Sequence, residues 1–208
     1  MHFLQTIIIA LMATSATAFT LPGGLEDGLY RAYYDKEGRE VHEPVGNVTT
    51  TAPTRRHKAR RSEASALDSL EKRQLGATYD VYCGCGYGLD HGDCDAAVSD
   101  LSNQFGGYDG YPCATILEGM SYYSIRGSVV AFGCNTGTAG DIGICGNEYG
   151  EVLQVVTVQC GAYTAGTFAY LTSYNVPLPE PYINLGYMQY YAGLDFCGNA
   201  DLSPVSYC

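Results

Sequence analysis

The sequence contains no tryptophan, and its 208 residues hold only 11 Lys and Arg side chains against 22 Asp and Glu. The few basic residues are unevenly spread, because Arg126 is the only Lys or Arg that follows Arg73. The part of the chain after Arg73 carries 13 acidic side chains and this one arginine, a net charge near −12 with His91 neutral. Such a surface repels phosphate backbones and anionic lipid, which argues against nucleic acid and membranes as partners.

Cysteine is also missing from the first 82 residues and then occurs nine times, after the dipeptide Lys72-Arg73. Cysteines this dense in a short secreted domain predict disulfides, whereas Cys83-Gly84-Cys85 is one residue short of a zinc-ligand pair. An odd count predicts four disulfides and one thiol that is either buried or bridges two chains into a covalent dimer. The nine candidates, whose connectivity the sequence leaves open, are Cys83, Cys85, Cys94, Cys113, Cys134, Cys145, Cys160, Cys197 and Cys208.

No apolar run reaches the roughly 20 residues that a transmembrane helix needs. Residues 3–12 form a short apolar run, and the small residues up to Ala18 fit a signal-peptidase site. We therefore expect residues 1–18 to be a signal peptide and the protein to be secreted. The C-terminus lacks the hydrophobic tail of a lipid-anchor signal.

Residues 19–73 read as a pro-segment that ends in a dibasic cleavage site, Lys72-Arg73, ahead of a mature cysteine-rich domain, residues 74–208. The pro-segment has no cysteine and no sustained apolar period, so we expect it to have no core of its own. It also carries the glycosylation sequon at Asn47. Its basic run between Arg55 and Arg61 is open to a second interpretation, as a solvated charge run or a nucleic-acid tail.

The pattern of the mature domain predicts an α+β fold. Helices are expected over 93–104, capped by Asp93 and ended by Gly106-Gly107, and over 147–160, capped by Asn147 and ended by Gly161. The second helix competes with a strand, because its valines favour β-structure. Strands are expected over 79–83, 128–134, 166–173 and 186–191, with 128–134 in the centre because it is apolar throughout. Together these elements predict a small disulfide-rich sandwich, with two helices packed on one antiparallel sheet.

Candidate catalytic residues are few. His91 is the only histidine after Arg73, and a turn that feeds a capped helix explains it better than acid–base or metal chemistry does. No nucleophile elbow and no phosphate-binding loop occurs, and no metal or cofactor is expected. The 13 acids leave a carboxylate pair for glycoside hydrolysis open, although no local motif singles out such a pair.

One enzyme alternative rests on a resemblance. Small secreted fungal ribonucleases are likewise acidic, rich in Tyr and Gly and disulfide-bonded, and they use His, Glu and Arg for catalysis. His91, Glu118 and Arg126 resemble that set in their order along the chain. Those enzymes also need a second His near the end of the chain, which this sequence lacks. The resemblance thus implies a ribonuclease-like hydrolase without activity. Because Arg126 is a lone cation among 13 acids, we expect it instead to pair with a nearby carboxylate for structure.

A second resemblance covers residues 93–170. It lies in the order of Asp93-Cys94, the string from Gly127 to Cys134, the segment from Glu148 to Gly161, and Ala165-Gly166-Thr167. This order resembles the secreted fungal effectors of the killer-toxin-like and necrosis-inducing-factor kind, although their usual Trp is absent. The resemblance implies an extracellular toxin or virulence effector, matured from a dibasic precursor, and it carries over no catalytic residue.

These observations predict a secreted effector that acts outside the cell by binding a host or competitor protein or glycan. Export, delayed activation and disulfides suit that role, and no convincing catalytic set is present. The alternatives are the ribonuclease-like hydrolase and a structural protein of the cell wall.

Overall fold

The computed structural model describes residues 19–46, 78–107, 112–137, 140–171 and 181–198. The signal peptide, Asn47 and Lys72-Arg73 lie outside these ranges, so their roles stay predictions. In chain order the elements are β1 (Gly28–Tyr34), β2 (Glu40–Pro44), β3 (Thr78–Gly88), α2 (His91–Phe105), β4 (Ala114–Ile116), β5 (Met120–Arg126), β6 (Val129–Asn135), β7 (Ile142–Ile144), α3 (Gly146–Cys160), β8 (Thr164–Leu171) and β9 (Pro181–Gln189).

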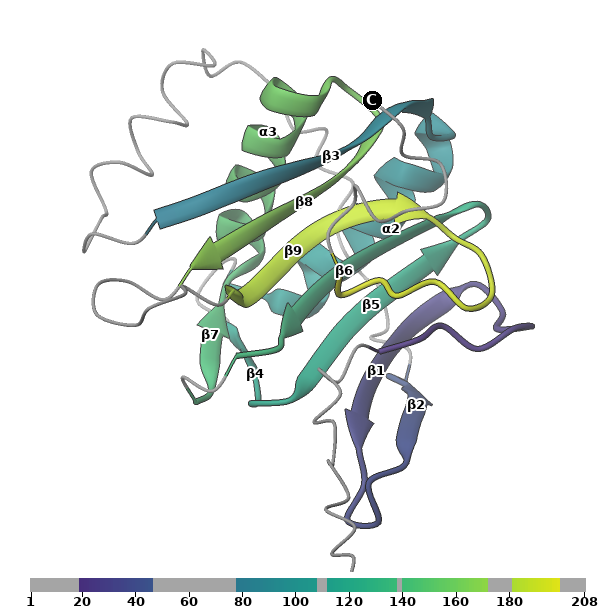
Figure 1. Cartoon of the computed structure of the whole chain (residues 1–208), viewed down its shortest axis with the longest axis vertical. Coiled ribbons are helices and arrows are strands. Elements are labelled where there is room, and N and C mark those ends of the chain that lie inside the picture. The colour runs from purple at the N-terminus through teal and green to yellow at the C-terminus, as the bar shows by residue number, and fades with distance from the viewer. Residues whose placement is uncertain (1–18, 47–77, 108–111, 138–139, 172–180, 199–208) are drawn as a thin grey trace, which may run out of the picture.

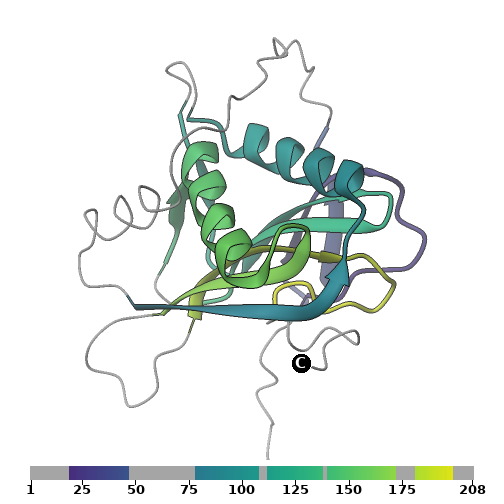
Figure 2. The same ribbon diagram turned by 90° about the horizontal axis from the view of Figure 1, so that it is seen from above.

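The main sheet has seven strands in the order β2-β1-β5-β6-β9-β8-β3, and each neighbouring pair is antiparallel. Strand β6 occupies the middle position and all its residues are buried, which confirms the central strand that its apolar sequence predicts. Strands β4 and β7 form a separate two-stranded sheet. In Figures 1 and 2 both helices lie on the same side of the main sheet. The α+β class with two helices on an antiparallel sheet is therefore confirmed, while the finer description as a small sandwich stays an interpretation.

Both expected helices are present, but each begins earlier than predicted because a different residue caps it. Asp90 caps α2, since its carboxylate accepts a hydrogen bond from the Asp93 amide at 3.0 Å. Cys145 occupies the N-cap position of α3, and the Glu148 carboxylate accepts a bond from its amide at 3.1 Å. The cap assignments to Asp93 and Asn147 were therefore wrong, whereas the glycine at each helix end is confirmed.

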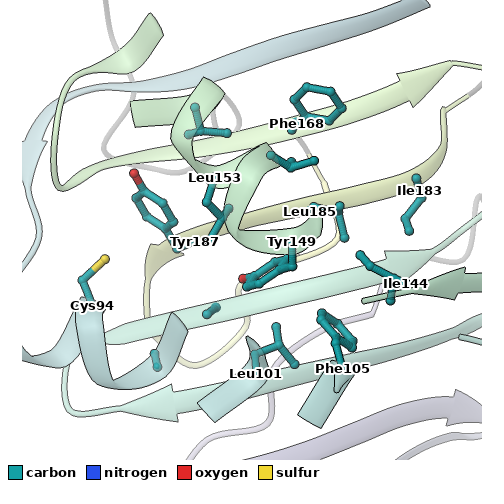
Figure 3. Packing of buried hydrophobic residues seen from close by; sticks show 14 of the residues in the cluster. Cys94, Leu101, Phe105, Ile144, Tyr149, Leu153, Phe168, Ile183, Leu185 and Tyr187 are labelled. Atoms are coloured by element: carbon teal, nitrogen blue, oxygen red, sulfur yellow. The ribbon is translucent and has the colours of Figure 1, made fainter. Parts of the chain in front are cut away.

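The helices cover one face of the sheet with a single apolar core. Helix α2 packs on β5 and β6, and α3 packs on β8, β3 and β9. Figure 3 shows this layer, in which Tyr149 is fully buried and its hydroxyl donates to the Gly186 carbonyl at 3.1 Å. The predicted apolar stripe of α2 lies in this layer, with Cys94, Leu101 and Phe105 buried among its members.

Three disulfides join cysteines far apart in the sequence: Cys83–Cys160, Cys113–Cys145 and Cys134–Cys197. The unpaired cysteine among those described is Cys94, which is buried. A covalent dimer would therefore need a different thiol. The side chains of Cys85 and Cys208 lie outside the described part of the chain, and the fourth disulfide stays a prediction.

The opposite face of the sheet is closed by segments from both ends of the chain. Residues 19–46, which we call the leader segment, are the described part of the predicted pro-segment. Phe19 and Leu21 of the leader segment are buried here beside Leu194 and Phe196, which follow β9. These side chains are thus buried in a core shared with the mature domain. Residues 47–73 lie outside the described residues, so the expectation for the whole pro-segment stays a prediction.

Candidate functional site

The structure separates Glu118 from Arg126, two of the three residues that resemble a ribonuclease site. Glu118 is exposed and precedes β5, whereas Arg126 is the last residue of that strand. Six residue steps along a strand span about 20 Å, which is too far for two groups acting on one phosphodiester. Glu118 and Arg126 therefore follow the ribonuclease order along the chain but do not share one site.

Arg126 pairs with a carboxylate on the neighbouring helix, as expected. Its guanidinium contacts Asp100 of α2, with Nε at 2.6 Å from Oδ2 and Nη2 at 2.5 Å from the same oxygen. Ser124, on the same face of β5, donates to this oxygen at 3.2 Å. The contact joins α2 to β5 and gives the only arginine after Arg73 a structural role.

His91 is the first residue of α2, and its exposed ring stacks on Tyr163 with ring centroids 3.8 Å apart. The phenol of Tyr163 in turn donates a long hydrogen bond to Asp95, at 3.5 Å. His91 therefore packs on a neighbouring ring at the start of a helix, which fits the interpretation as a turn before a capped helix. Within the described residues no group of three or more His, Cys, Asp or Glu side chains is placed to hold a metal ion.

The most extensive contact that the sequence did not predict joins the leader segment to the mature domain. Strand β1 pairs with β5 from Gly28 opposite Ile125 to Tyr33 opposite Met120. Strand β2 pairs with β1 and forms the outer edge of the sheet (Figure 1). The leader segment therefore supplies two of the seven strands.

Aromatic side chains meet across this contact. Tyr30 of β1 stacks on Tyr123 of β5 with ring centroids 5.3 Å apart, and Phe19 packs against Phe196 at 6.3 Å. Imidazole Nδ1 of His42 on β2 lies 2.7 Å from the Tyr123 hydroxyl. Burial raises the pKa of Tyr123 well above its ordinary value, so this phenol stays neutral and available for the hydrogen bond.

Backbone groups extend the contact beyond the strands. The Leu21 amide donates to the Leu194 carbonyl at 2.9 Å, and the Gly193 amide donates to the Leu21 carbonyl at 2.8 Å. At the other end of β1, the Gly127 amide donates to the Asp27 carboxylate at 2.9 Å. The disulfide Cys134–Cys197 fixes the loop that receives Leu21 to the central strand β6.

A surface groove of about 400 Å³ opens where the leader segment meets the loop before β5. Its walls are Arg31, Tyr33 and Tyr34 of the leader segment and residues 117–120 of the mature domain. Leu117 is 48% exposed, one of the few large apolar side chains on the described surface. Glu118, a residue singled out by the sequence, also lines this groove.

Two polar side chains of the groove, Arg31 and Tyr33, are held by Glu43 within the leader segment. The Glu43 carboxylate accepts from Arg31 at 2.7 Å and from the Tyr33 hydroxyl at 2.7 Å. These hydrogen bonds lower the pKa of Glu43 and raise that of Tyr33. The groove thus presents a held arginine, a neutral tyrosine and an exposed leucine, and Arg and Tyr are side chains enriched where proteins bind partners.

The leader strands had a sequence signal that periodicity alone did not reveal. A run with three tyrosines, Gly28–Tyr34, and a short run that contains Val41, Glu40–Pro44, flank residues 35–39, which contain Gly38. Short runs separated by a Gly-containing loop are typical of a hairpin. Gly38 has a φ of 75°, the left-handed conformation that glycine adopts most easily.

Comparisons with known proteins identify no relative: no protein-family model, curated protein or solved structure matches this chain. Among the described residues, none of the helices has the length and apolar character to cross a membrane.

Proposed function

We propose that this chain is the precursor of a secreted effector or toxin-like protein, which acts outside the producing cell by binding a protein or glycan of a host or competitor. The observation that carries the proposal is the groove between Tyr33 and Leu117. It offers aromatic, apolar and charged contacts on the surface, with about 400 Å³ for a partner.

Three features of the chain support an extracellular role. Disulfides such as Cys83–Cys160 are typical of oxidising compartments. The apolar run of residues 3–12 fits a signal peptide, and Lys72-Arg73 fits a processing site. The strongly acidic mature domain favours a protein or glycan over nucleic acid or anionic lipid.

The test compares two exposed apolar side chains, Leu117 in the groove at 48% exposure and Val158 on α3 at 45%. Tagged wild-type protein from the culture medium is used to capture partners from host and competitor extracts. Affinity for the captured partner is then measured for Leu117→Asp and for the matched control Val158→Asp. We expect about tenfold weaker binding for Leu117→Asp and little change for the control.

Two results would contradict the proposal. The first is capture of no partner together with quantitative retention of the protein in the producer's own wall, which favours the structural wall protein. The second is turnover of RNA by purified protein that Arg126→Ala abolishes, which favours the ribonuclease-like alternative.

A further inference from the structure

We propose that strand β5 and the aromatic face beside it bind the leader segment in trans, so that after cleavage at Arg73 residues 19–46 stay attached as a second, non-covalently held chain. The secreted protein is then a two-chain complex, and the leader segment is a structural subunit of it. This inference goes beyond the proposed function and stands independently of which partner the groove binds.

The first argument is the state of β5 without the leader segment. Tyr123 and Ile125 point to the face that the leader segment covers and are 0% and 1% exposed. Removing β1 would leave β5 as an unpaired sheet edge and would uncover these side chains. Long apolar edges of this kind pair with other chains and aggregate. A domain starting at Gln74 therefore needs an occupant at this edge.

The second argument is that one core is built from both sides of the cleavage site. Phe19 and Leu21 are each 1% exposed, and Ala32 of β1 is 0% exposed. They belong to the same buried cluster as Phe132 of the central strand and Phe196. Burial to this degree resembles an obligate subunit interface more than the contact of a releasable tail.

The third argument is the position of the basic sites. Arg55-Arg56, Arg60-Arg61 and Lys72-Arg73 all lie in residues 47–77, between the last described leader residue and β3. A cut at any of them leaves every described contact of the leader segment intact. Because no cysteine precedes Cys83, the leader segment has no means of forming a disulfide to the mature domain. The association must then rest on the β1–β5 ladder and on the shared core.

The specificity of the site follows from the contacts that cross it. The partner must be an extended strand, antiparallel to β5, that places an aromatic ring over Tyr123 and a small side chain opposite Ser121. Tyr30 and Ala32 meet these requirements, with His42 adding a hydrogen bond to the Tyr123 hydroxyl. Strand addition of this kind draws affinity from the backbone and specificity from alternate side chains.

Native mass spectrometry of the protein secreted by the producing cells tests the proposal. We expect a complex whose mass is the sum of residues 74–208 and a leader fragment that begins near Phe19 and ends between Arg56 and Arg73. Denaturation without reductant should separate the two chains. Detection of residues 74–208 alone, or of one uncut chain, would overturn the proposal.

A matched pair of variants tests whether the assigned contact holds the chains together. Tyr123→Phe removes a hydroxyl that bonds across the interface, whereas Tyr163→Phe removes one that bonds to Asp95 within the mature domain. We expect Tyr123→Phe to raise the dissociation constant of the leader fragment about threefold to tenfold. Tyr163→Phe should leave it unchanged.

Equal dissociation of both variants and the wild type on dilution would contradict the site. Unchanged circular dichroism would show in each case that the conservative change has not unfolded the domain. A stable two-chain protein that captures no partner would refute the proposed function and leave this inference intact.

Discussion

Cys94 shows how a single residue accounts for the odd cysteine count. It is 4% exposed on the buried face of α2, and burial, helped by the charge of Asp95, raises the pKa of its thiol to about 12. A buried thiol of this kind is a small apolar side chain without nucleophilic character. We expect thiol reagents to leave the folded protein unlabelled at pH 8.

The same reagents should label one thiol per chain after denaturation without reductant, because the predicted fourth disulfide leaves only Cys94 unpaired. Cys94→Ala is the control and should abolish this signal. Labelling of Cys94 in the folded protein, or of three thiols after denaturation, would contradict the assignment.

Asp195 gives a prediction about pH. Burial raises the pKa of this half-buried carboxyl above its ordinary 3.8 and the charge of Glu40 adds to the effect, while amide hydrogen bonds from Gly198 and Cys197 oppose it. The folded protein therefore keeps this proton to a higher pH than the unfolded chain does. The cost of the buried charge is absent below pH 3.8 and is fully present above the raised pKa.

Asp195→Asn keeps an oxygen that can accept from the Gly198 amide, now at 3.0 Å, and removes the ionisation. As the pH rises from 3.8 through the raised pKa of Asp195, we expect this variant to lose less unfolding free energy than the wild type. Glu118→Gln makes the same change in net charge at an exposed site. Identical pH profiles for the two variants, measured by urea unfolding, would show that Asp195 has no special role.

For single residues, the sequence predicted the type of contact that a side chain makes better than it predicted which residue is contacted. The lone Arg126 in an acidic domain was expected to pair with a carboxylate, and it does so with Asp100. The helix caps were misplaced because Asp90 and Asp93 are both suitable, and only the tertiary fold directs Asp93 to the amide and hydroxyl of Ser128 instead.

Two glycines, one in a helix and one in the sheet, differ in the space that a side chain would have. Gly150 is exposed within α3, and a Cβ there would meet nothing within 4 Å. Gly186 of β9 lies against the Gly166 carbonyl, and a Cβ there would also come within 2.8 Å of Phe132. The two positions should therefore respond to the same substitution with opposite signs.

We expect Gly150→Ala to stabilise the protein by about 0.5–1 kcal/mol, since alanine is the better helix former. Gly186→Ala should cost about 3 kcal/mol or more, because the backbone of β8 cannot yield to the added methyl. Urea unfolding of both variants measures the two effects. A destabilised Gly150→Ala, or an unchanged Gly186→Ala, would show that these elements are packed differently.

The sequence predicted the elements whose apolar residues follow a clear pattern. Helix α2 shows its apolar stripe directly, and β6 is apolar throughout. Strand β5 was missed because polar and apolar residues do not alternate along its sequence, Met-Ser-Tyr-Tyr-Ser-Ile-Arg, and Ser121 and Ser124 are both buried beside tyrosines. Its two faces are covered by α2 and by the leader segment, so no period of two appears in its sequence.

At the scale of the whole molecule, composition predicts two separate parts on either side of Arg73. In the structure, residues from both parts pair in one sheet. The cysteine and charge distributions led us to predict export and cleavage. They contain no information about which strand fills the edge of β5, because that depends on a pairing between residues about 90 positions apart, such as Tyr30 with Tyr123. The α+β class followed from local patterns, whereas the contribution of the leader segment required the three-dimensional structure.

The central claim is that the leader segment is part of the folded sheet in the secreted protein. Peptide-resolved hydrogen exchange of that protein, without any added variant, tests the claim most directly. We predict that amides of Leu29–Tyr34 and of Met120–Arg126 exchange slowly, at rates comparable to those of β6. Peptides from residues 28–34 that are absent, or that exchange as fast as an unfolded chain, would contradict it.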